Sequence, residues 1–321
     1  MSMDEHITDI GGVKVNTYTR AQFLDVLTQK LQVRNKIFIT TLYSEFLYAA
    51  MKDKKIRDML NTATFALPDG IAVPWAQTFL SVPLTKKSHF SKAIQGLWQL
   101  VYSGASILLN PTFIRKTIPE NIVGADLIWD LSALAGHYHF SIYLLGGFNN
   151  TANIVADKLK KRFANITIVG ASNKNPDDPS IVADINESKA DFLFVAFGPI
   201  RQEQWIANHL PYLNIKLAIG LGGTFDYVAG TRKPPPSFIR DIGLEWLYRL
   251  LAQPHRAKRI WNGTWNLCKA LLHYKVYSSY PYRKNVACVV INSKNQILIC
   301  ERIPRVAPGF PESVLEDARN H

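Results

Sequence analysis

The sequence predicts an α/β protein with a Rossmann-like, mainly parallel sheet sandwich and a basic helical C-terminal appendage. Short apolar runs at residues 36–41, 141–145 and 191–197 are typical of buried strands, and helix-like segments separate them. Strands without a polar face must be covered on both sides, which favours a parallel sheet with crossover helices. Glycine-containing turns follow several of these strands, at the edge where open α/β sheets bind ligands.

The individual elements follow from hydrophobic periodicity and from capping signals. Thr19 is expected to cap a helix over Arg20–Leu31, because its side chain can accept from the first free N–H groups. The other expected strands are Val13–Val15, Lys36–Thr41, Thr62–Leu67, Ser141–Leu145, Ile166–Val169, Asp191–Phe197 and Lys216–Gly220, and the other expected helices are Ser44–Met51, Ala152–Phe163 and the region of Glu203–Asn208. Together they predict a core over residues 1–230.

Two segments interrupt this alternation. Residues 84–118 are expected to be an insertion, with five apolar residues close to one helical face between basic flanks: Ile94, Leu97, Trp98, Val101 and Leu108. A core helix and a helix at a membrane interface are both open for this segment. The tail 285–321 contains a hairpin-like run, Val286–Cys300, which resembles the opening hairpin of a Nudix hydrolase domain. No Nudix box follows it, so we interpret it as a truncated remnant.

The charge of the chain is strongly positive and unevenly distributed. Lys and Arg outnumber Asp and Glu by 37 to 25, and residues 231–284 hold eleven basic residues against Asp241 and Glu245. This balance predicts an anionic partner. Aromatic residues interleave with the arginines there, which favours an anionic membrane surface over nucleic acid. A solvated basic face is the simpler alternative.

Composition also excludes several classes of protein. A content of 47% hydrophobic and 19% charged residues excludes a disordered chain. Three cysteines without metal-ligand spacing argue against a disulfide framework and a zinc site: Cys268, Cys288 and Cys300. We expect no secretory signal at the start and no membrane-spanning helix, because no apolar run reaches roughly 18 residues. A protein that is soluble or lies on a membrane surface is expected.

Asp69 is the candidate catalytic residue. It stands between Pro68 and Gly70, where an apolar strand leads into a helix-like segment. Proline sets the direction of the chain and glycine allows a positive φ, so the turn can hold a carboxylate at the sheet edge as a general base. A plain turn is the alternative for these three residues taken alone.

Three further junctions predict a pocket for a phosphate-bearing nucleotide. Gly146-Gly147 precedes a helix start, residues 198–203 combine Gln202 with a cation and a carboxylate, and residues 222–226 combine two glycines with Asp226. Helix N-termini and close backbone approach suit phosphate groups. A complete G-x-G-x-x-G is absent, so a nicotinamide cofactor is a weak alternative.

These blocks, in this order, resemble the WecG/TagA/CpsF glycosyltransferases. The resemblance covers residues 10 to 262, and its blocks are Thr41-Leu42, Ser44-Glu45-Phe46, Pro68-Asp69-Gly70-Ile71, residues 123–127, residues 144–147, Gly198 with Arg201-Gln202-Glu203, residues 222–226 and residues 244–249. It implies an inverting enzyme that moves an N-acetylmannosamine-type or related sugar from a UDP-sugar to a polyprenyl-diphosphate-linked sugar. Such transfer belongs to cell-surface polysaccharide or teichoic-acid-type biosynthesis.

The resemblance also implies roles for individual residues. Asp69 matches the general base and Thr41 a neighbouring active-site residue, while Gln202 and Asp226 match positions that contact the nucleotide. Gln202 and Asp226, together with Gly146, Gly147 and Gly223, form the expected donor site. Three arginines match an appendage that meets the lipid diphosphate: Arg249, Arg256 and Arg259. We expect no metal, because no Asp-x-Asp motif is present, and no other cofactor.

Some positions depart from the family pattern. Tyr43 stands where the family has Asn, so it is expected to touch the donor sugar, and Asn121 and Val123 replace an Arg and a Thr. A catalytically impaired, membrane-recruited nucleotide-sugar-binding protein is therefore the alternative. The expected location is the inner face of the cytoplasmic membrane, and the oligomeric state, a homo-oligomer included, stays open.

Overall fold

The computed structural model describes residues 6–33, 35–86, 88–233 and 257–278, the single residues Ile239 and Tyr248, and the pairs 290–291 and 297–298. The chain divides into two compact units, Met1–Ser279 and Tyr280–His321. In the second unit, β9 (Val290–Ile291) pairs antiparallel with β10 (Ile297–Leu298), as a hairpin requires.

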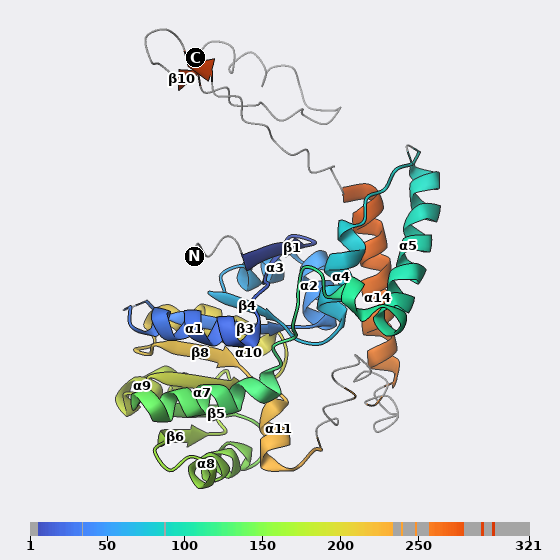
Figure 1. The fold of residues 1–321 in the computed structure, drawn as a ribbon. Coiled ribbons are helices and arrows are strands. Elements are labelled where there is room, and N and C mark those ends of the chain that lie inside the picture. The colour runs from blue at the N-terminus through green and yellow to red at the C-terminus, as the bar shows by residue number, and fades with distance from the viewer. Residues whose placement is uncertain are drawn as a thin grey trace. The chain divides into compact units, whose positions relative to one another are not determined.

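A six-stranded parallel sheet forms the centre of the first unit (Figure 1). Its order is β4-β3-β8-β7-β5-β6. The strands are β3 (Ile37–Leu42), β4 (Phe65–Pro68), β5 (Ser141–Gly146), β6 (Thr167–Ser172), β7 (Phe192–Ala196) and β8 (Leu217–Gly220). The predicted Rossmann-like α/β class is confirmed.

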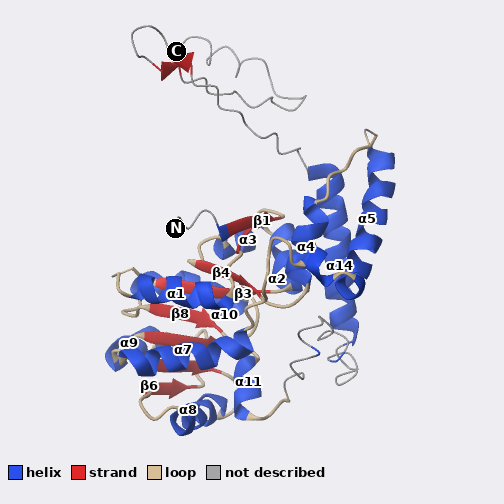
Figure 2. Ribbon diagram, viewed as in Figure 1, coloured by secondary structure: helices blue, strands red, loops and turns tan. Residues whose placement is uncertain are grey.

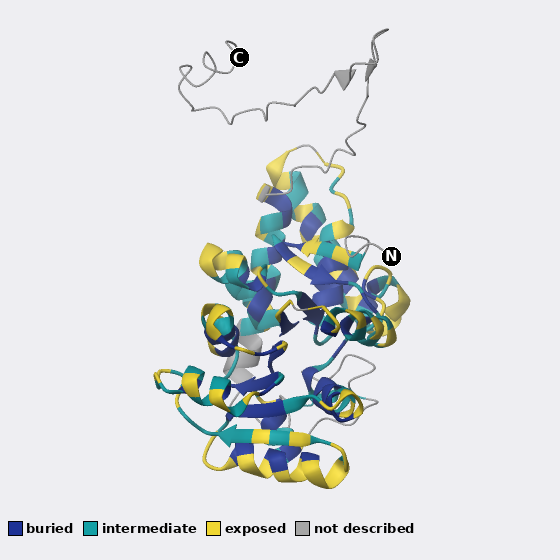
Figure 3. Ribbon diagram, turned by 90° about the vertical axis from the view of Figure 1, so that its left-hand side faces the viewer, coloured by how far each residue is buried: buried dark blue, intermediate teal, exposed yellow. Residues whose placement is uncertain are grey.

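Helices cover both faces of this sheet. Side chains of alternate strand residues point to opposite faces and therefore enter different cores. On β7, Phe192 and Phe194 pack under α1, α7, α8 and α11, whereas Leu193 and Val195 pack under α9 and α10. These helices are α1 (Arg20–Leu31), α7 (Gly124–Tyr138), α8 (Thr151–Arg162), α9 (Ile181–Ser188), α10 (Arg201–His209, followed by the 3₁₀ turn Leu210–Tyr212) and α11 (Thr224–Ala229). Figure 3 shows the inner strands as the buried centre of this arrangement, whereas the edge strand β6 has only intermediate and exposed residues.

A third core joins the β4 edge of the sheet to a layer of helices (Figure 2). Its members are the antiparallel pair β1 (Ile7–Ile10) and β2 (Val13–Asn16), and the helices α2 (Ser44–Lys52), α3 (Lys54–Leu60), α4 (Ala72–Ser81), α5 (His89–Leu109), α6 (Pro111–Ile114) and α14 (Ala257–His273, continued by a π-helical turn, Tyr274–Ser278). From α14, Leu267 and Leu271 are buried beside Phe46 and Phe79. Part of the predicted appendage thus completes a core that the first hundred residues begin.

Most predicted elements are confirmed within a few residues, and two differ. Thr19 caps α1 in a capping box with Gln22. Residues 62–64 are not strand, because the N–H groups of Thr62 and Ala63 bond to Met59 and Leu60 at the end of α3. The core-helix interpretation of residues 84–118 is wrong, since the five residues of the predicted face are all exposed. Among the described residues, the structure contains no helix long and apolar enough to span a bilayer.

Candidate active site

Asp69 lies at the carboxyl edge of the sheet, between β4 and α4. Its backbone N–H donates to the carbonyl of Leu42 at 2.7 Å and so extends the β3–β4 pairing by one residue. Its Oδ2 lies 3.4 Å from the backbone nitrogen of Gly124, which begins α7. The positive end of that helix stabilises the charged form of a carboxylate. Gly70 follows with φ +82°, a value that favours glycine.

Three oxygen-bearing side chains meet around Gly124. A β-carbon added at Gly124 would lie 3.5 Å from Oγ1 of Thr41 and 3.5 Å from Oγ1 of Thr224. Thr41 is near the end of β3, and Thr224 is the first residue of α11. The structure therefore brings Asp69 and Thr41 together, as expected, and adds Thr224 to them.

Gln202 and Glu203 form a buried pair at the start of α10. Nε2 of Gln202 donates to Oε1 of Glu203 at 2.8 Å, and the two side chains are 5% and 0% exposed. Oε1 of Gln202 is buried without a hydrogen-bond donor in the described part of the chain. It lies 3.3 Å from the position of a β-carbon on Gly222. A buried acceptor without a donor is costly, so a bound ligand that donates to it would be favoured.

The glycines of the next strand make room for this pair. A β-carbon at Gly220 would lie 2.5 Å from Oε1 of Glu203 and 2.6 Å from Nε2 of Gln202. Glu203 also accepts from the backbone nitrogen of Ile200 at 2.8 Å, and Ile200 has a φ of +68° that β-branched residues avoid. Burial raises the pKa of Glu203 to about 7, against the hydrogen bonds from Gln202 and Ile200 that lower it.

Gly146 and Gly147 form a tight turn between β5 and α8. Both have positive φ, and the N–H of Gly147 donates to Ala196 at the end of β7 at 2.9 Å. A β-carbon at Gly147 would touch Thr151 at 3.0 Å and Phe225 at 3.7 Å. The turn thus lies against the first turn of α11. One free N–H of α8 is already used, because Ala152 donates to Oδ1 of Asn173.

The junction of residues 221–225 connects these groups. Gly222 faces Gln202, Thr224 faces Gly124 and Phe225 faces Gly147. Gly223 has open space where a side chain would stand. Asp226, by contrast, pairs with Arg232: Oδ2 lies 3.1 Å from Nη1, and the carboxylate is mostly buried.

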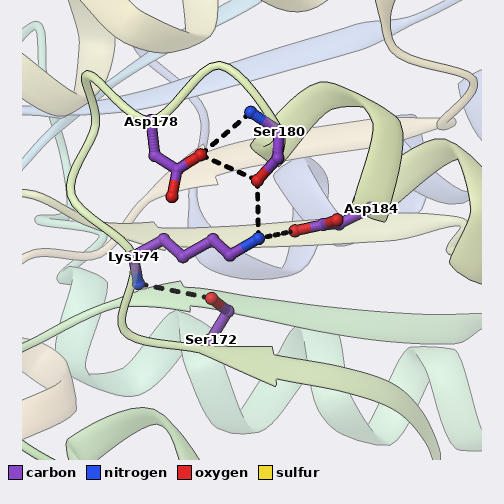
Figure 4. Close-up of polar contacts among 5 residues, drawn as sticks. All are labelled: Ser172, Lys174, Asp178, Ser180 and Asp184. Atoms are coloured by element: carbon purple, nitrogen blue, oxygen red, sulfur yellow. Dashed lines mark hydrogen bonds and ion pairs between the residues drawn. The ribbon is translucent and has the colours of Figure 1, made fainter.

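A polar network orders the loop after β6, next to the start of α10 (Figure 4). The ammonium group of Lys174 donates to Ser180 and pairs with Asp184, and Asp178 accepts from the N–H and hydroxyl of Ser180. Residues of α10 hold the same loop, since Arg201 bonds to Asp177 and Trp205 to the carbonyl of Pro176. The loop is thereby tied to the helix that carries Gln202.

Of the remaining predicted residues, the structure describes Tyr43 next to α2 and Arg259 in α14. The ring of Tyr43, at the start of α2, packs edge-on against Phe46 with centroids 4.9 Å apart. Helix α14 passes α2 closely, since a β-carbon at Gly263 would lie 4.0 Å from Cγ of Glu45. Arg259 belongs to α14, whereas Arg249 and Arg256 lie outside the described residues.

Sequence reasoning missed the roles of Gly124, Thr224 and Glu203. All three stand in blocks of the sequence resemblance, but nothing in the sequence shows that the start of α7 reaches Asp69 or that a glutamate is fully buried. The sequence predicted the carboxylate of Glu203 at this helix start but not its partner. Glu203 stands three residues after Ile200, the spacing of a capping glutamate, and that signal could have predicted its hydrogen bond from the backbone of Ile200. Among the described residues, no three His, Cys, Asp or Glu side chains gather as a metal site would require.

The fold and this site define a Rossmann-like α/β protein with its polar site at the carboxyl edge of the sheet. A family model, the glycosyl transferase WecG/TagA/CpsF family, matches residues 8–100 and 79–279. The chain belongs to this family and is a glycosyltransferase.

Curated relatives carry one enzyme name, N-acetylglucosaminyldiphosphoundecaprenol N-acetyl-beta-D-mannosaminyltransferase. The protein of Bacillus subtilis strain 168 is 30% identical over 241 residues, which cover 74% of this chain and 80% of the relative. That of Bacillus spizizenii is 29% identical, over 73% of this chain and 78% of the relative. That of Staphylococcus aureus strain MRSA252 is 25% identical, over 78% and 87%.

Proposed function

We propose that this glycosyltransferase moves an N-acetylmannosamine-type or related sugar from a UDP-sugar to a polyprenyl-diphosphate-linked sugar, with inversion at the anomeric carbon. The observation that carries the proposal is the placement of Asp69, whose carboxylate lies at the N-terminus of α7 beside Thr41 and Thr224. The names of the relatives support the sugar and the lipid-linked acceptor.

Asp69 acts as the general base. It accepts the proton of the acceptor hydroxyl while the hydroxyl oxygen attacks the anomeric carbon, and the bond from that carbon to the diphosphate oxygen breaks. One displacement inverts the configuration, and UDP leaves with the bonding electrons. Thr41 and Thr224 supply hydroxyl groups beside this carboxylate to orient the acceptor or the donor sugar.

The donor nucleotide occupies the edge between β5, β7 and β8. The buried Oε1 of Gln202 offers an acceptor for an N–H or O–H group of the ligand. The Gly146-Gly147 turn lets the ligand come close to the backbone, and the backbone N–H of Gly223 stabilises the charge of the departing diphosphate, as helix starts do for phosphates. Asp226 acts through Arg232, which it holds near the end of α11.

The acceptor approaches from the side of the appendage. Arg249, Arg256 and Arg259 meet its diphosphate, and an anionic membrane surface at the inner face of the cytoplasmic membrane presents the polyprenyl chain. Of the basic appendage, the described part packs on α2, next to the end of β3.

The release of UDP tests the proposal. The protein is incubated with a panel of UDP-sugars, with and without a polyprenyl-diphosphate-linked sugar, and UDP and the product are measured. Release from one donor that depends on the acceptor, with an inverted linkage in the product, is expected. Binding of UDP-sugar without turnover on any lipid-linked acceptor would instead favour the catalytically impaired binding protein.

A further inference from the structure

Helix α5 has its large apolar residues on the outside. Trp98 is 66% exposed and Leu109 is 83% exposed, and six neighbours on the helix are also exposed: Phe90, Ile94, Leu97, Val101, Tyr102 and Leu108. We call these eight residues the α5 outer face. Soluble monomers rarely expose so continuous an apolar surface without a function.

The side of α5 that faces the protein is made of small and polar residues. Gly96, Ser103 and Ser106 are its buried residues. A β-carbon at Gly96 would lie 2.7 Å from Cδ1 of Leu272, so α5 packs closely on α14 there, and Ser103 accepts a hydrogen bond from Trp75 at 3.1 Å. Half-buried Leu100 and Ile107 complete the contact. The helix is thus firmly attached with its apolar face outward.

The charges around this face are all of one sign. Residues 70–119 contain five Lys or Arg and no Asp or Glu. Residues 257–278 contain three Lys or Arg besides the buried Lys275, and no Asp or Glu. On the same layer, exposed Tyr277 stacks on His89 at the start of α5, and exposed Trp265 lies under the ammonium group of Lys269. Aromatic residues and lysines around an apolar helix face are what an anionic lipid interface accommodates.

We propose that the α5 outer face is a membrane-docking surface that inserts into the interface of an anionic bilayer. A second copy of the chain fits less well, because two such faces would bring like charges together, and residues 70–119 and 257–278 contain no carboxylate to pair with them. Each lysine or arginine near an anionic surface adds about 1 kcal/mol to binding. The layer stands on the side toward which the strands point (Figure 2).

This inference extends the proposed function, because docking there would hold the enzyme where a polyprenyl-linked acceptor is embedded. Lipid binding by the α5 outer face does not depend on which sugar the enzyme transfers. The full chain is therefore tested first for binding to vesicles of phosphatidylcholine with and without phosphatidylglycerol.

The test variant replaces three residues of the face together, Ile94→Ser, Trp98→Ser and Val101→Ser. All three are exposed, so the fold has little reason to change, which circular dichroism and thermal melting check. A matched control replaces two exposed apolar residues elsewhere, Val33→Ser and Tyr212→Ser. Binding of the test variant to anionic vesicles is expected to fall by about tenfold or more, and that of the control to stay unchanged.

Charge and position are tested separately. Lys86→Gln with Lys92→Gln and Lys116→Gln should weaken binding to anionic vesicles and leave the weaker binding to neutral vesicles unchanged. Brominated lipids should quench tryptophan fluorescence in the wild type and less in Trp98→Phe.

Unchanged vesicle binding by the triple-serine variant would overturn the inference, as would loss of a dimer in that variant without any vesicle binding by the wild type.

Transfer assays separate this inference from the proposed function. With a short-chain, water-soluble acceptor the triple-serine variant should work at the wild-type rate, and only transfer to acceptor embedded in vesicles should fall. If the wild type failed on both acceptors but bound vesicles through the α5 outer face, the proposed function would fail and the docking surface would stand. An equal loss on both acceptors in the variant would contradict the docking role.

Discussion

At the residue scale, the site depends on carboxylates whose surroundings differ. Asp69 lies at the start of a helix, where charge is stabilised, whereas Glu203 is fully buried and has a pKa raised to about 7. The first arrangement suits a carboxylate that accepts a proton from the acceptor hydroxyl. The second suits a structural group that holds Ile200 and Gln202 in place.

Replacing the base should stop the chemistry and spare the fold. Asp69→Asn keeps the size of the side chain but cannot accept the acceptor's proton, so kcat is expected to fall by about 10²–10⁴-fold. Affinity for the UDP-sugar and the melting temperature should stay close to wild type. Steady-state kinetics and calorimetry measure both, with the exposed Asp58→Asn as control. Transfer near the wild-type rate would remove Asp69 from the base role.

Glu203 should make folding stability depend on pH. The unfolded chain loses this proton near 4.5 and the folded chain near 7, so between these values the folded state binds more protons. The free energy of unfolding therefore falls as pH rises through this range, by about 3 kcal/mol from this group. Glu203→Gln should remove that component, because the amide does not ionise.

Urea denaturation from pH 4 to pH 8, roughly the range over which the group titrates, checks this expectation. The exposed Glu187→Gln serves as control and should keep the wild-type slope. If Glu203→Gln showed the same loss of stability with rising pH as the wild type, the pH dependence would come from other groups.

At the scale of elements, α10 can pack closely against β8 because β8 ends in a glycine, Gly220. Gly220→Ala would place a methyl group against Glu203 and Gln202, both buried, and one of them must move. Such overpacking costs about 1–3 kcal/mol, and displacement of Gln202 should also weaken donor binding. Chemical denaturation and a UDP-sugar titration measure the two effects.

Gly104→Ala is the matched control for that substitution. Gly104 lies in α5 with open space around its α-carbon, so alanine should raise stability by up to about 1 kcal/mol through helix preference alone. If Gly220→Ala and Gly104→Ala changed the free energy of unfolding equally, the close contact of Gly220 with Gln202 and Glu203 would not be what makes alanine unfavourable at position 220.

At the scale of the whole molecule, chain segments far apart in sequence complete one core. Leu271 of α14 is fully buried with residues of α2 and α4. Leu271→Ala should lower the free energy of unfolding by about 2–5 kcal/mol, because it leaves a cavity. Leu97→Ala, on the α5 outer face, should change it little. Equal effects in a denaturation experiment would contradict the packing described for α14.

The same layer contains a buried cation. Lys275 donates to the carbonyl of Phe79 in the last turn of α4, and its ammonium group lies 4.3 Å from the centroid of the Phe79 ring. Burial lowers the pKa of Lys275 to about 8. This contact ties the end of the chain's first unit to a helix that begins at residue 72.

The sequence by itself determined the α/β class, the order of most elements and the family. It could do so because apolar strands without a polar face require helices on both sides, and because turn glycines and motif residues are local features. Only the tertiary structure decided that Gly124 and Thr224 join Asp69, that Glu203 is buried and that α5 turns its apolar face outward. Periodicity shows that a helix has two different faces, but which one faces the protein depends on residues of other segments, here Leu272 and Trp75, packing against Gly96 and Ser103.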